Sequence, residues 1–274
     1  MKLPRSIRVI ERGWLSANNV VLHEESEAVV VDSGYVAHAP QTLALLERAL
    51  AGKKLARLVN THCHSDHMGG NAAIQKKFGC TISIPQGEAP AIDNWDEQQL
   101  ILTVADQRAQ AFSYDDTFRD GDVLQMGGLD WQVIAAPGHD THAVMFYSPE
   151  ARVLISGDAL WENGFGVVFP QLFGRDTALA ETRATLESIG RLDVDLVIPG
   201  HGRISDHADV TYYRDMITII RDRMVDMIKN GMTLAQVKAA RPTRDYDLRY
   251  GKTTGAWTTD MFVEAAYNSL KKSS

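Results

Sequence analysis

Short apolar runs separated by turn-forming residues dominate the first two-thirds of the chain. Val20–His23 and Ala28–Asp32 flank an acidic turn, and this spacing predicts a hairpin. Further strands are expected at 6–12, 55–60, 80–84, 123–126, 131–135, 143–148, 152–156 and 195–198.

Helical spacing of apolar residues appears between these strands. Leu43, Leu46 and Leu50 share one helical face, and Gly52 follows as a stop signal. Helices are also expected over 71–78, 93–112 and 176–192. The pattern therefore predicts a mixed α/β body.

After about residue 205 the pattern becomes helical. Apolar residues from Val210 to Ile228 mark a long amphipathic helix, and Thr233 with Gln236 has the spacing of a capping box. We expect residues 206–274 to form a helical extension packed on the same domain as residues 1–205. Its apolar face could also pair two subunits in a homodimer.

Composition narrows the function classes. The 274 residues are 45% hydrophobic and 23% charged, as in a globular protein, and two Cys exclude a disulfide-dense scaffold. The net charge of −7 disfavours nucleic acid as a partner. No apolar run approaches the length of a membrane span, and the N-terminus lacks the apolar segment of a secretion signal. We therefore expect a cytoplasmic protein that binds a small-molecule substrate and no membrane.

Histidines gather where strand-like runs give way to turns. Polar side chains at strand ends are where α/β proteins build their sites. The residues in this context are His62, His64, Asp66 and His67 after Val59, His139 after Pro137-Gly138, Asp158 after Gly157, and His201 after Pro199-Gly200.

The spacing of the first run has a geometric meaning. In an extended segment residues i and i+2 point the same way, so His62 and His64 can bind one ion together. Asp66 and His67 follow at the turn and can serve a second position. Imidazole and carboxylate ligands suit Zn²⁺ best, with Fe and Mn as alternatives. Seven candidates are too many for one tetrahedral ion and suit two ions about 3.5–4 Å apart.

These motifs resemble those of the metallo-β-lactamase-fold hydrolase superfamily. The resemblance spans residues 18–205 and is closer to glyoxalase II and related thioesterases than to true β-lactamases. It implies a catalytic domain at 1–205, built as a four-layer αβ/βα sandwich of two mixed β-sheets flanked by helices. It also implies that His62, His64 and His139 hold one Zn²⁺, that Asp66, His67 and His201 hold a second, and that Asp158 bridges them.

The expected chemistry is hydrolysis of a small-molecule ester, thioester or lactone. Two cations lower the pKa of a bridging water, and the resulting hydroxide attacks a polarised carbonyl. Asp66 is the catalytic candidate for orienting that hydroxide and relaying a proton. The second ring nitrogens of the histidine ligands need acceptors, and Asp32 and backbone carbonyls are candidates.

Several alternatives stay open on the sequence. The same ligands could serve a β-lactamase, a phosphodiesterase or an iron-dependent persulfide dioxygenase, or a metal site without catalysis. Trp161, Asn163 and Phe165 could line the substrate mouth or could pack in the core. Cys63 and Cys80 are expected to be packing residues, and the substrate itself is not specified.

Overall fold

The first sheet carries six strands in chain order. The computed structural model describes residues 2–13, 16–103, 106–161, 177–245, 263–264, 266–268 and 270–271. The strands are β1 (Ile7–Ile10), β2 (Asn19–His23), β3 (Glu27–Val31), β4 (Lys54–Val59), β5 (Thr81–Pro85) and β6 (Asp116–Phe118). The predicted hairpin is β2–β3, and β1 adds to it antiparallel. From β3 to β6 the pairing is parallel, so the sheet is mixed.

The second sheet has five strands in the order β11-β10-β9-β8-β7. They are β7 (Val123–Met126), β8 (Leu129–Ala135), β9 (Val144–Ser148), β10 (Val153–Trp161) and β11 (Leu196–His201). β7 to β10 pair antiparallel, whereas β10 and β11 pair parallel, so this sheet is mixed as well.

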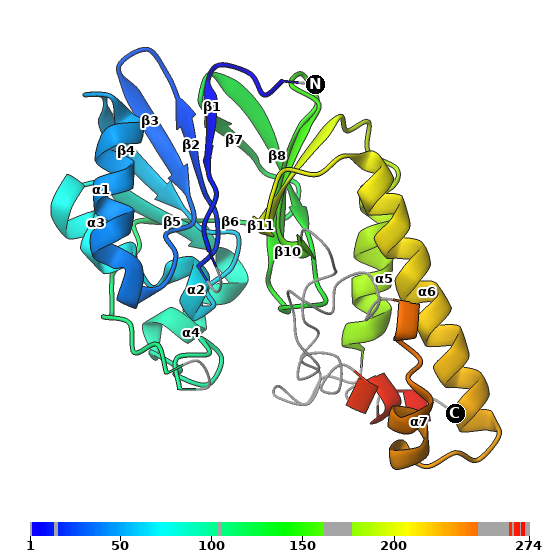
Figure 1. Ribbon diagram of the computed structural model, residues 1–274. Helices are drawn as coiled ribbons and strands as arrows, with labels where there is room; N and C mark the ends of the chain where they lie inside the picture. The colour runs from blue at the N-terminus through cyan, green and yellow to red at the C-terminus, as the bar shows by residue number, and fades with distance from the viewer. Residues whose placement is uncertain are drawn as a thin grey trace.

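The two sheets pack face to face, and helices cover their outer faces (Figure 1). Helices α1 (Ala39–Leu50) and α3 (Asn71–Phe78) lie against the first sheet, and α5 (Ala178–Ile189) and α6 (His207–Lys229) lie against the second. The shorter helices are η1 (Val36–His38), α2 (Ser65–Met68), η2 (Gln86–Glu88), α4 (Ala89–Asp93) and α7 (Leu234–Ala240). The predicted α/β sandwich of two mixed sheets flanked by helices is confirmed.

Successive side chains along a strand point to opposite faces of its sheet, and this alternation separates the core between the sheets from the cores under the helices. Val20 and Leu22 of β2 point into the core between the sheets, whereas Val21 points toward the helices of the first sheet. Val144 and Phe146 of β9 enter the same central core, and Met145 faces the helices of the second sheet. Strands buried on both faces read as continuous apolar runs, which is the pattern seen in the sequence.

The expected helix over 93–112 is wrong for the part of that segment the structure describes. Helix α4 ends at Asp93, and turns follow up to residue 103. Leu100, Ile101 and Leu102 are buried in succession, and Ile101 has a φ of +54°. Because a helix turns about 100° per residue, three consecutive side chains cannot share one buried face. Packing in the core therefore overrides local helix propensity here.

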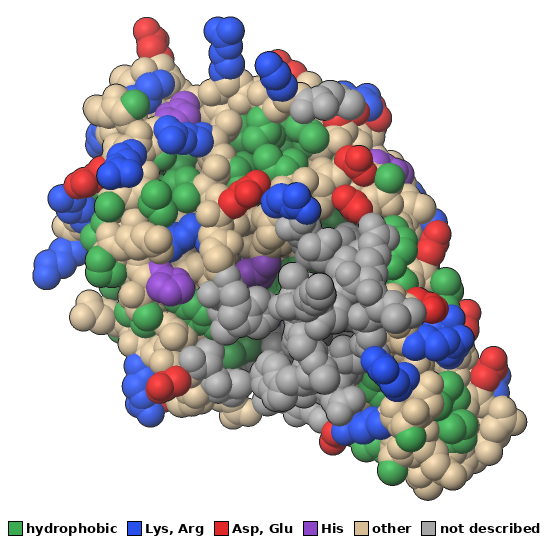
Figure 2. All heavy atoms as spheres, viewed as in Figure 1, with side chains coloured by type: hydrophobic (Ala, Val, Ile, Leu, Met, Phe, Trp, Pro, Cys, Tyr) green, Lys and Arg blue, Asp and Glu red, His purple; other side chains and the backbone are tan. Residues whose placement is uncertain are grey.

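The C-terminal helices pack on the second sheet. Val210 and Met224 of α6 and Val237 of α7 belong to the same buried cluster as Leu154 of β10. The capping box of Thr233 and Gln236 opens α7 as the sequence predicts. None of the described helices combines the length and apolarity that crossing a bilayer requires. Acidic and basic side chains are interspersed over the face drawn in Figure 2.

The parallel strands bring their ends to one edge. Asp32 follows β3, the segment from Asn60 to His67 follows β4, and η2 with Glu88 follows β5. In the second sheet, β8 leads to His139, and β10 and β11 run in parallel to the same side. Chain segments far apart in sequence therefore place polar residues next to one another.

Asn18 joins the two sheets at this edge. Its side-chain nitrogen donates to the carbonyls of Pro199, at 3.0 Å, and Gly202, at 2.7 Å. Its Oδ1 accepts the backbone N–H of Arg12 at 2.9 Å. Asn18 is 3% exposed, so these groups have no ready access to water.

We expect Asn18→Ala to destabilise the protein by about 1–3 kcal/mol, because it leaves buried polar groups unpaired. Asn94→Ala is the control, since among the described residues the side chain of Asn94 bonds within its own exposed turn, to the carbonyl of Pro90 at 2.8 Å, and its loss should change the free energy of unfolding little. Urea denaturation measures both variants. Equal stability of the two would contradict the linking role of Asn18.

Candidate metal centre

Three imidazoles converge at the first position. His62 and His64 come from the segment after β4, and His139 comes from the loop after β8. His64 Nδ1 lies 3.0 Å from His62 Nε2 and 2.9 Å from His139 Nε2. All three residues are buried. We call these residues the first group.

Two carboxylates and two imidazoles form a second group, consisting of Asp66, His67, Asp158 and His201. His201 Nε2 lies 3.0 Å from Asp66 Oδ2, and His67 Nε2 lies 3.0 Å from Asp158 Oδ1. Asp66 and His67 stand on the short helix α2, and His201 ends β11. The structure therefore brings all seven candidates from the sequence to one edge of the sandwich.

Asp158 touches both groups. Its Oδ2 lies 3.3 Å from His139 Nε2, while its Oδ1 lies 3.4 Å from His201 Nε2. The sequence predicted that the strand ends before this residue, but β10 continues from Val153 to Trp161. Its register with β11 shifts on both sides of Gly157. Such an irregularity redirects a side chain, and here the carboxylate lies between the two groups.

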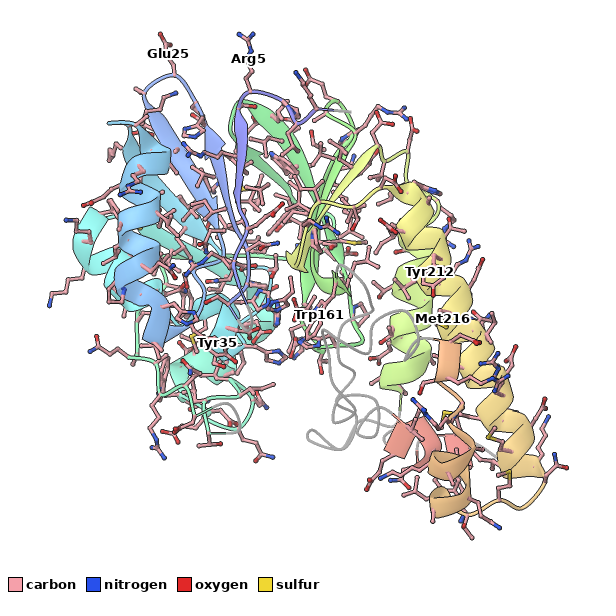
Figure 3. The ribbon with its side chains drawn as sticks, in the orientation of Figure 1. Arg5, Glu25, Tyr35, Trp161, Tyr212 and Met216 are labelled. Carbon is pink, nitrogen blue, oxygen red and sulfur yellow. The ribbon has the colours of Figure 1, made fainter. Side chains whose placement is uncertain are left out.

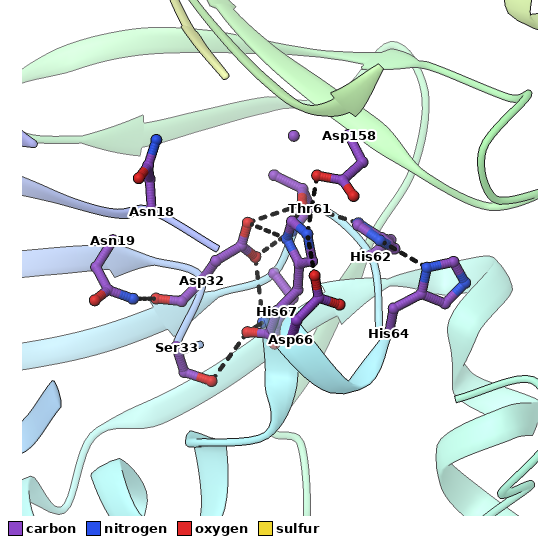
Figure 4. A network of polar contacts seen from close by, with 12 residues as sticks. Asn18, Asn19, Asp32, Ser33, Thr61, His62, His64, Asp66, His67 and Asp158 are labelled. Atoms are coloured by element: carbon purple, nitrogen blue, oxygen red, sulfur yellow. Dashed lines mark hydrogen bonds and ion pairs between the residues drawn. The ribbon is translucent and has the colours of Figure 1, made fainter. Parts of the chain in front are cut away.

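Asp32 fixes the orientation of His67 (Figure 4). Its Oδ2 accepts from His67 Nδ1 at 2.8 Å, which leaves Nε2 to face the carboxylates of the second group. Thr61 donates to the same carboxylate from its backbone N–H and from its hydroxyl, each at 2.9 Å. Asp32 therefore provides the acceptor that the sequence suggested for a histidine ligand.

The charges of the site are strongly coupled. Burial, followed by the neighbouring His67 and His64, holds the pKa of His62 well below its usual value. Burial alone would raise the pKa of Asp158, but the imidazoles of His201 and His67 outweigh burial and lower it well below its usual value. Burial opposes protonation of His67, yet Asp158 and Asp32 outweigh it and raise its pKa. The positive charge of protonated imidazoles thus compensates the negative charge of the buried carboxylates.

The residues of both groups fit a divalent cation. Within each group the nitrogen and oxygen atoms lie within 4.8 Å of one another. His67 Nε2, His201 Nε2 and Asp158 Oδ1 are buried, and within the described part of the chain they face other ligand candidates at 3.0–3.4 Å without a hydrogen bond of regular geometry. Buried polar atoms of this kind need a compensating interaction, which a cation can supply. Imidazole and carboxylate donors suit Zn²⁺ and neighbouring transition metals.

The remaining sequence candidates are distributed as follows. Trp161 packs its ring against those of His201, at a centroid distance of 4.6 Å, and His139, at 6.5 Å. Figure 3 places Trp161 on the side of the second sheet and Tyr35 on the side of the first. Asn163 and Phe165 lie outside the described residues. Cys63 and Cys80 are buried in the core of the first sheet, as expected.

Two acidic residues escaped the sequence analysis. Asp140 follows His139 directly, and its Oδ2 lies 3.4 Å from His64 Nε2. Glu88 is buried, and burial and the nearby Asp140 raise its pKa well above its usual value. Glu88 follows a strand end, which is the sequence context that identified the histidines. A single Glu in a polar turn, however, is normally interpreted as a solvent-exposed residue. Burial alone distinguishes it.

Gly200 permits the position of Asp158, because a Cβ there would overlap Asp158 Oδ1 and approach the backbone of Gly157. We expect Gly200→Ala to lower Zn²⁺ affinity by roughly 10–100-fold, the range seen when residues around a metal ligand are disturbed. Gly190→Ala is the matched control, since the nearest atom to its Cβ would be 3.5 Å away. Competition with a chromophoric chelator measures the affinity. Equal affinities would refute this account of Asp158.

Metal binding should release protons. Burial disfavours the charged form of His201, but Asp158 and Asp66 outweigh burial and raise its pKa to about 9. His201 of the metal-free protein is therefore protonated at neutral pH, and a cation must displace that proton. We expect apparent Zn²⁺ affinity to rise with pH up to about 9. Calorimetry in buffers of different ionisation enthalpy detects the released protons, and a heat independent of buffer would contradict the prediction.

Sequence comparison places these features in a family. The chain matches the model of the Metallo-beta-lactamase superfamily over residues 12–201. A hydroxyacylglutathione hydrolase of Hyphomonas neptunium is 30% identical over 148 residues, which is 50% of this chain and 50% of that protein. Another from Brucella anthropi is 31% identical over 152 residues, or 55% of this chain and 49% of that protein. The match thus spans about half the length of these relatives.

Solved structures share the fold. A metallo-beta-lactamase family protein of Thermus thermophilus has a TM-score of 0.70 at 18% identity, covering 97% of this chain and 92% of that one. A beta-lactamase domain protein of Burkholderia ambifaria has a TM-score of 0.71 at 20% identity, covering 97% and 85%. From the family match, with its fold and its cluster of histidines and aspartates, we conclude that this chain belongs to the metallo-β-lactamase superfamily.

Proposed function

We propose that this protein is a metal-dependent hydrolase that uses two Zn²⁺ ions to cleave a small-molecule ester, thioester or lactone. The observation that carries the proposal is the carboxylate of Asp158, whose two oxygens contact different groups of potential ligands. A carboxylate between two groups is the arrangement that two neighbouring cations require. His62, His64 and His139 would hold one cation, and Asp66, His67 and His201 would hold the other.

Bound cations would supply Lewis acidity toward a substrate carbonyl and would lower the pKa of coordinated water. The protein itself contributes by orienting the candidate ligands. Asp32 orients His67, and Thr61 holds Asp32 through two hydrogen bonds. The site is therefore organised before substrate arrives, which lowers the reorganisation cost of reaction.

Asp66 is the candidate for relaying a proton during hydrolysis. Its side chain is 15% exposed, whereas those of His67 and Asp158 are 0% and 2% exposed. The carboxylate of Asp66 can therefore meet a substrate that enters from solvent. Burial would raise its pKa, but the neighbouring His67 and then His201 outweigh burial and lower it, so Asp66 is ionised at neutral pH.

Among the three proposed substrate types, a thioester is supported by the names of the related proteins. Hydroxyacylglutathione hydrolases are named for removing an acyl group from glutathione, whose thiol carries it as a thioester. Trp161 is a candidate wall of the substrate site, because its ring lies beside His139 of the first group and His201 of the second. We propose Asn163 and Phe165 as further substrate contacts.

A hydrolysis panel tests the reaction class. Zinc-loaded protein is assayed against thioesters, lactones and simple esters, with a β-lactam and a phosphodiester in parallel. The proposal predicts turnover in the first three classes. Preferential cleavage of the β-lactam or the phosphodiester would overturn the substrate class. A single bound iron together with oxygen consumption on a persulfide would overturn hydrolysis itself.

We expect Asp158→Ala and His62→Ala each to lower turnover by roughly 100-fold or more, since removing a ligand should exceed the 10–100-fold effect of its supporting residues. Both variants should also retain less Zn²⁺ in elemental analysis. His142→Ala is the matched control, because His142 is exposed although it lies only three residues from His139. Wild-type turnover in either ligand variant would refute the assignment.

A further inference from the structure

Helix α5 buries two threonines on the face where an amphipathic helix normally buries apolar residues. Its buried stripe follows helical spacing and consists of Ala178, Thr182, Thr185, Leu186 and Ile189. Thr182 and Thr185 are each 5% exposed. A buried hydroxyl needs a hydrogen-bond partner, so the partner of each threonine shows what its side chain contributes.

The two hydroxyls bond to different parts of the chain. Thr182 Oγ1 donates to the carbonyl of Ala178 at 2.8 Å, one turn earlier in the same helix, which is a common bond for a threonine inside a helix. Thr185 Oγ1 instead donates to the carbonyl of Pro137 at 2.8 Å, which lies 48 positions earlier in the sequence. Pro137 belongs to the loop after β8 that carries His139. Thr185 therefore joins α5 to the loop of a candidate metal ligand.

The loop that carries His139 is a tight turn closed by its own hydrogen bonds. The backbone N–H of Gly138 donates to the carbonyl of Asp140 at 3.1 Å, across His139. The backbone N–H of His142 donates to Asp140 Oδ1 at 2.6 Å. A turn closed in this way moves as a unit, so a contact at Pro137 also determines where His139 lies.

The same loop lies directly against the backbone of α5. Gly138 has a φ of +144°, and a Cβ at this position would lie 2.7 Å from the Cα and 2.9 Å from the nitrogen of Thr182. Beyond this contact, His139 Nε2 lies 2.9 Å from His64 Nδ1 and 3.3 Å from Asp158 Oδ2. A shift of the loop away from α5 would therefore change the geometry of the first group.

We propose that Thr185 is a positioning residue for His139: its hydrogen bond to Pro137 holds the loop against α5, so that the His139 ring meets the other imidazoles of the first group. The inference rests on the proposed metal site. Asp32 supports the second group by bonding the ring of His67 directly, whereas Thr185 acts on the backbone of a ligand's loop. Its loss should therefore weaken metal binding less than the loss of a residue that bonds a ligand itself.

The test removes the hydroxyl of Thr185 and keeps the shape of the side chain. Thr185→Val is nearly isosteric but has no donor, whereas Thr185→Ser keeps the donor. Thr182→Val is the matched control, because Thr182 has the same burial and bonds within its own helix. Zn²⁺ is titrated against a chromophoric chelator in a His201→Ala background, which disables the second group. We expect Thr185→Val to weaken Zn²⁺ binding by roughly tenfold, the lower end of the range for residues that support a ligand, and the other two variants to stay within about threefold of the parent.

A general packing role predicts a different result. In a His139→Ala background, which leaves the second group intact, Thr185→Val should not change Zn²⁺ affinity, because its effect passes through His139. A packing defect would instead weaken Zn²⁺ binding in both backgrounds alike. Parental affinity of Thr185→Val, an equal loss in Thr185→Ser, or an equal loss in the His139→Ala background would overturn the inference.

The outcomes also separate this inference from the proposed function. If Thr185→Val does not fold, Thr185→Ala against Thr185→Ser replaces it, because alanine also removes the donor and favours the helix. The expected loss of Zn²⁺ affinity without hydrolysis of any panel substrate would overturn only the function. Hydrolysis of a panel substrate together with parental Zn²⁺ affinity of Thr185→Val would overturn only the inference. A wild-type chain that binds no Zn²⁺ would overturn both.

Discussion

The compensation of buried charge at Asp158 is the interaction on which the site depends. A carboxylate that is 2% exposed would be very costly to bury alone. Imidazoles from three separate chain segments surround it and lower its pKa, while it raises the pKa values of His67 and His201. Removing any one of these groups leaves the others with uncompensated charge. The same mutual dependence makes the cluster receptive to cations, which can replace the protons on the imidazoles.

Much of the fold and most of the site could be predicted from the sequence, because both depend on local patterns. Continuous apolar runs such as Ala28–Val31 mark strands that are buried on both faces, and the structure confirms the two sheets that they form. His62, His64 and His67 stand out because several histidines follow one strand within a few residues. Parallel pairing of β3, β4 and β5 then brings their ends together, which is a general consequence of topology.

What the sequence missed depends on tertiary contacts. Glu88 and Asp140 look like ordinary residues of polar turns, and only the burial of Glu88 and the position of Asp140 beside His64 distinguish them. The segment from 94 to 103 has the composition of a helix, yet three consecutive apolar side chains are buried, and Leu100 and Leu102 join the core of the first sheet. The extension of β10 past Gly157 also depends on pairing with β11, a partner about 40 residues away that local propensity does not contain.

The link made by Asn18 has a consequence for how the protein is assembled during synthesis. The hydrogen bond to Pro199 joins residues separated by 181 positions, and the backbone of Asn18 is bonded to Gly200 as well. Contacts of such separation close large loops and form late. A ribosome-bound chain can complete β4 and its histidines long before β11 emerges. The histidines after β4 are therefore synthesised well before β11. A nascent chain that bound a cation before β11 emerged would hold it with an incomplete set of ligands.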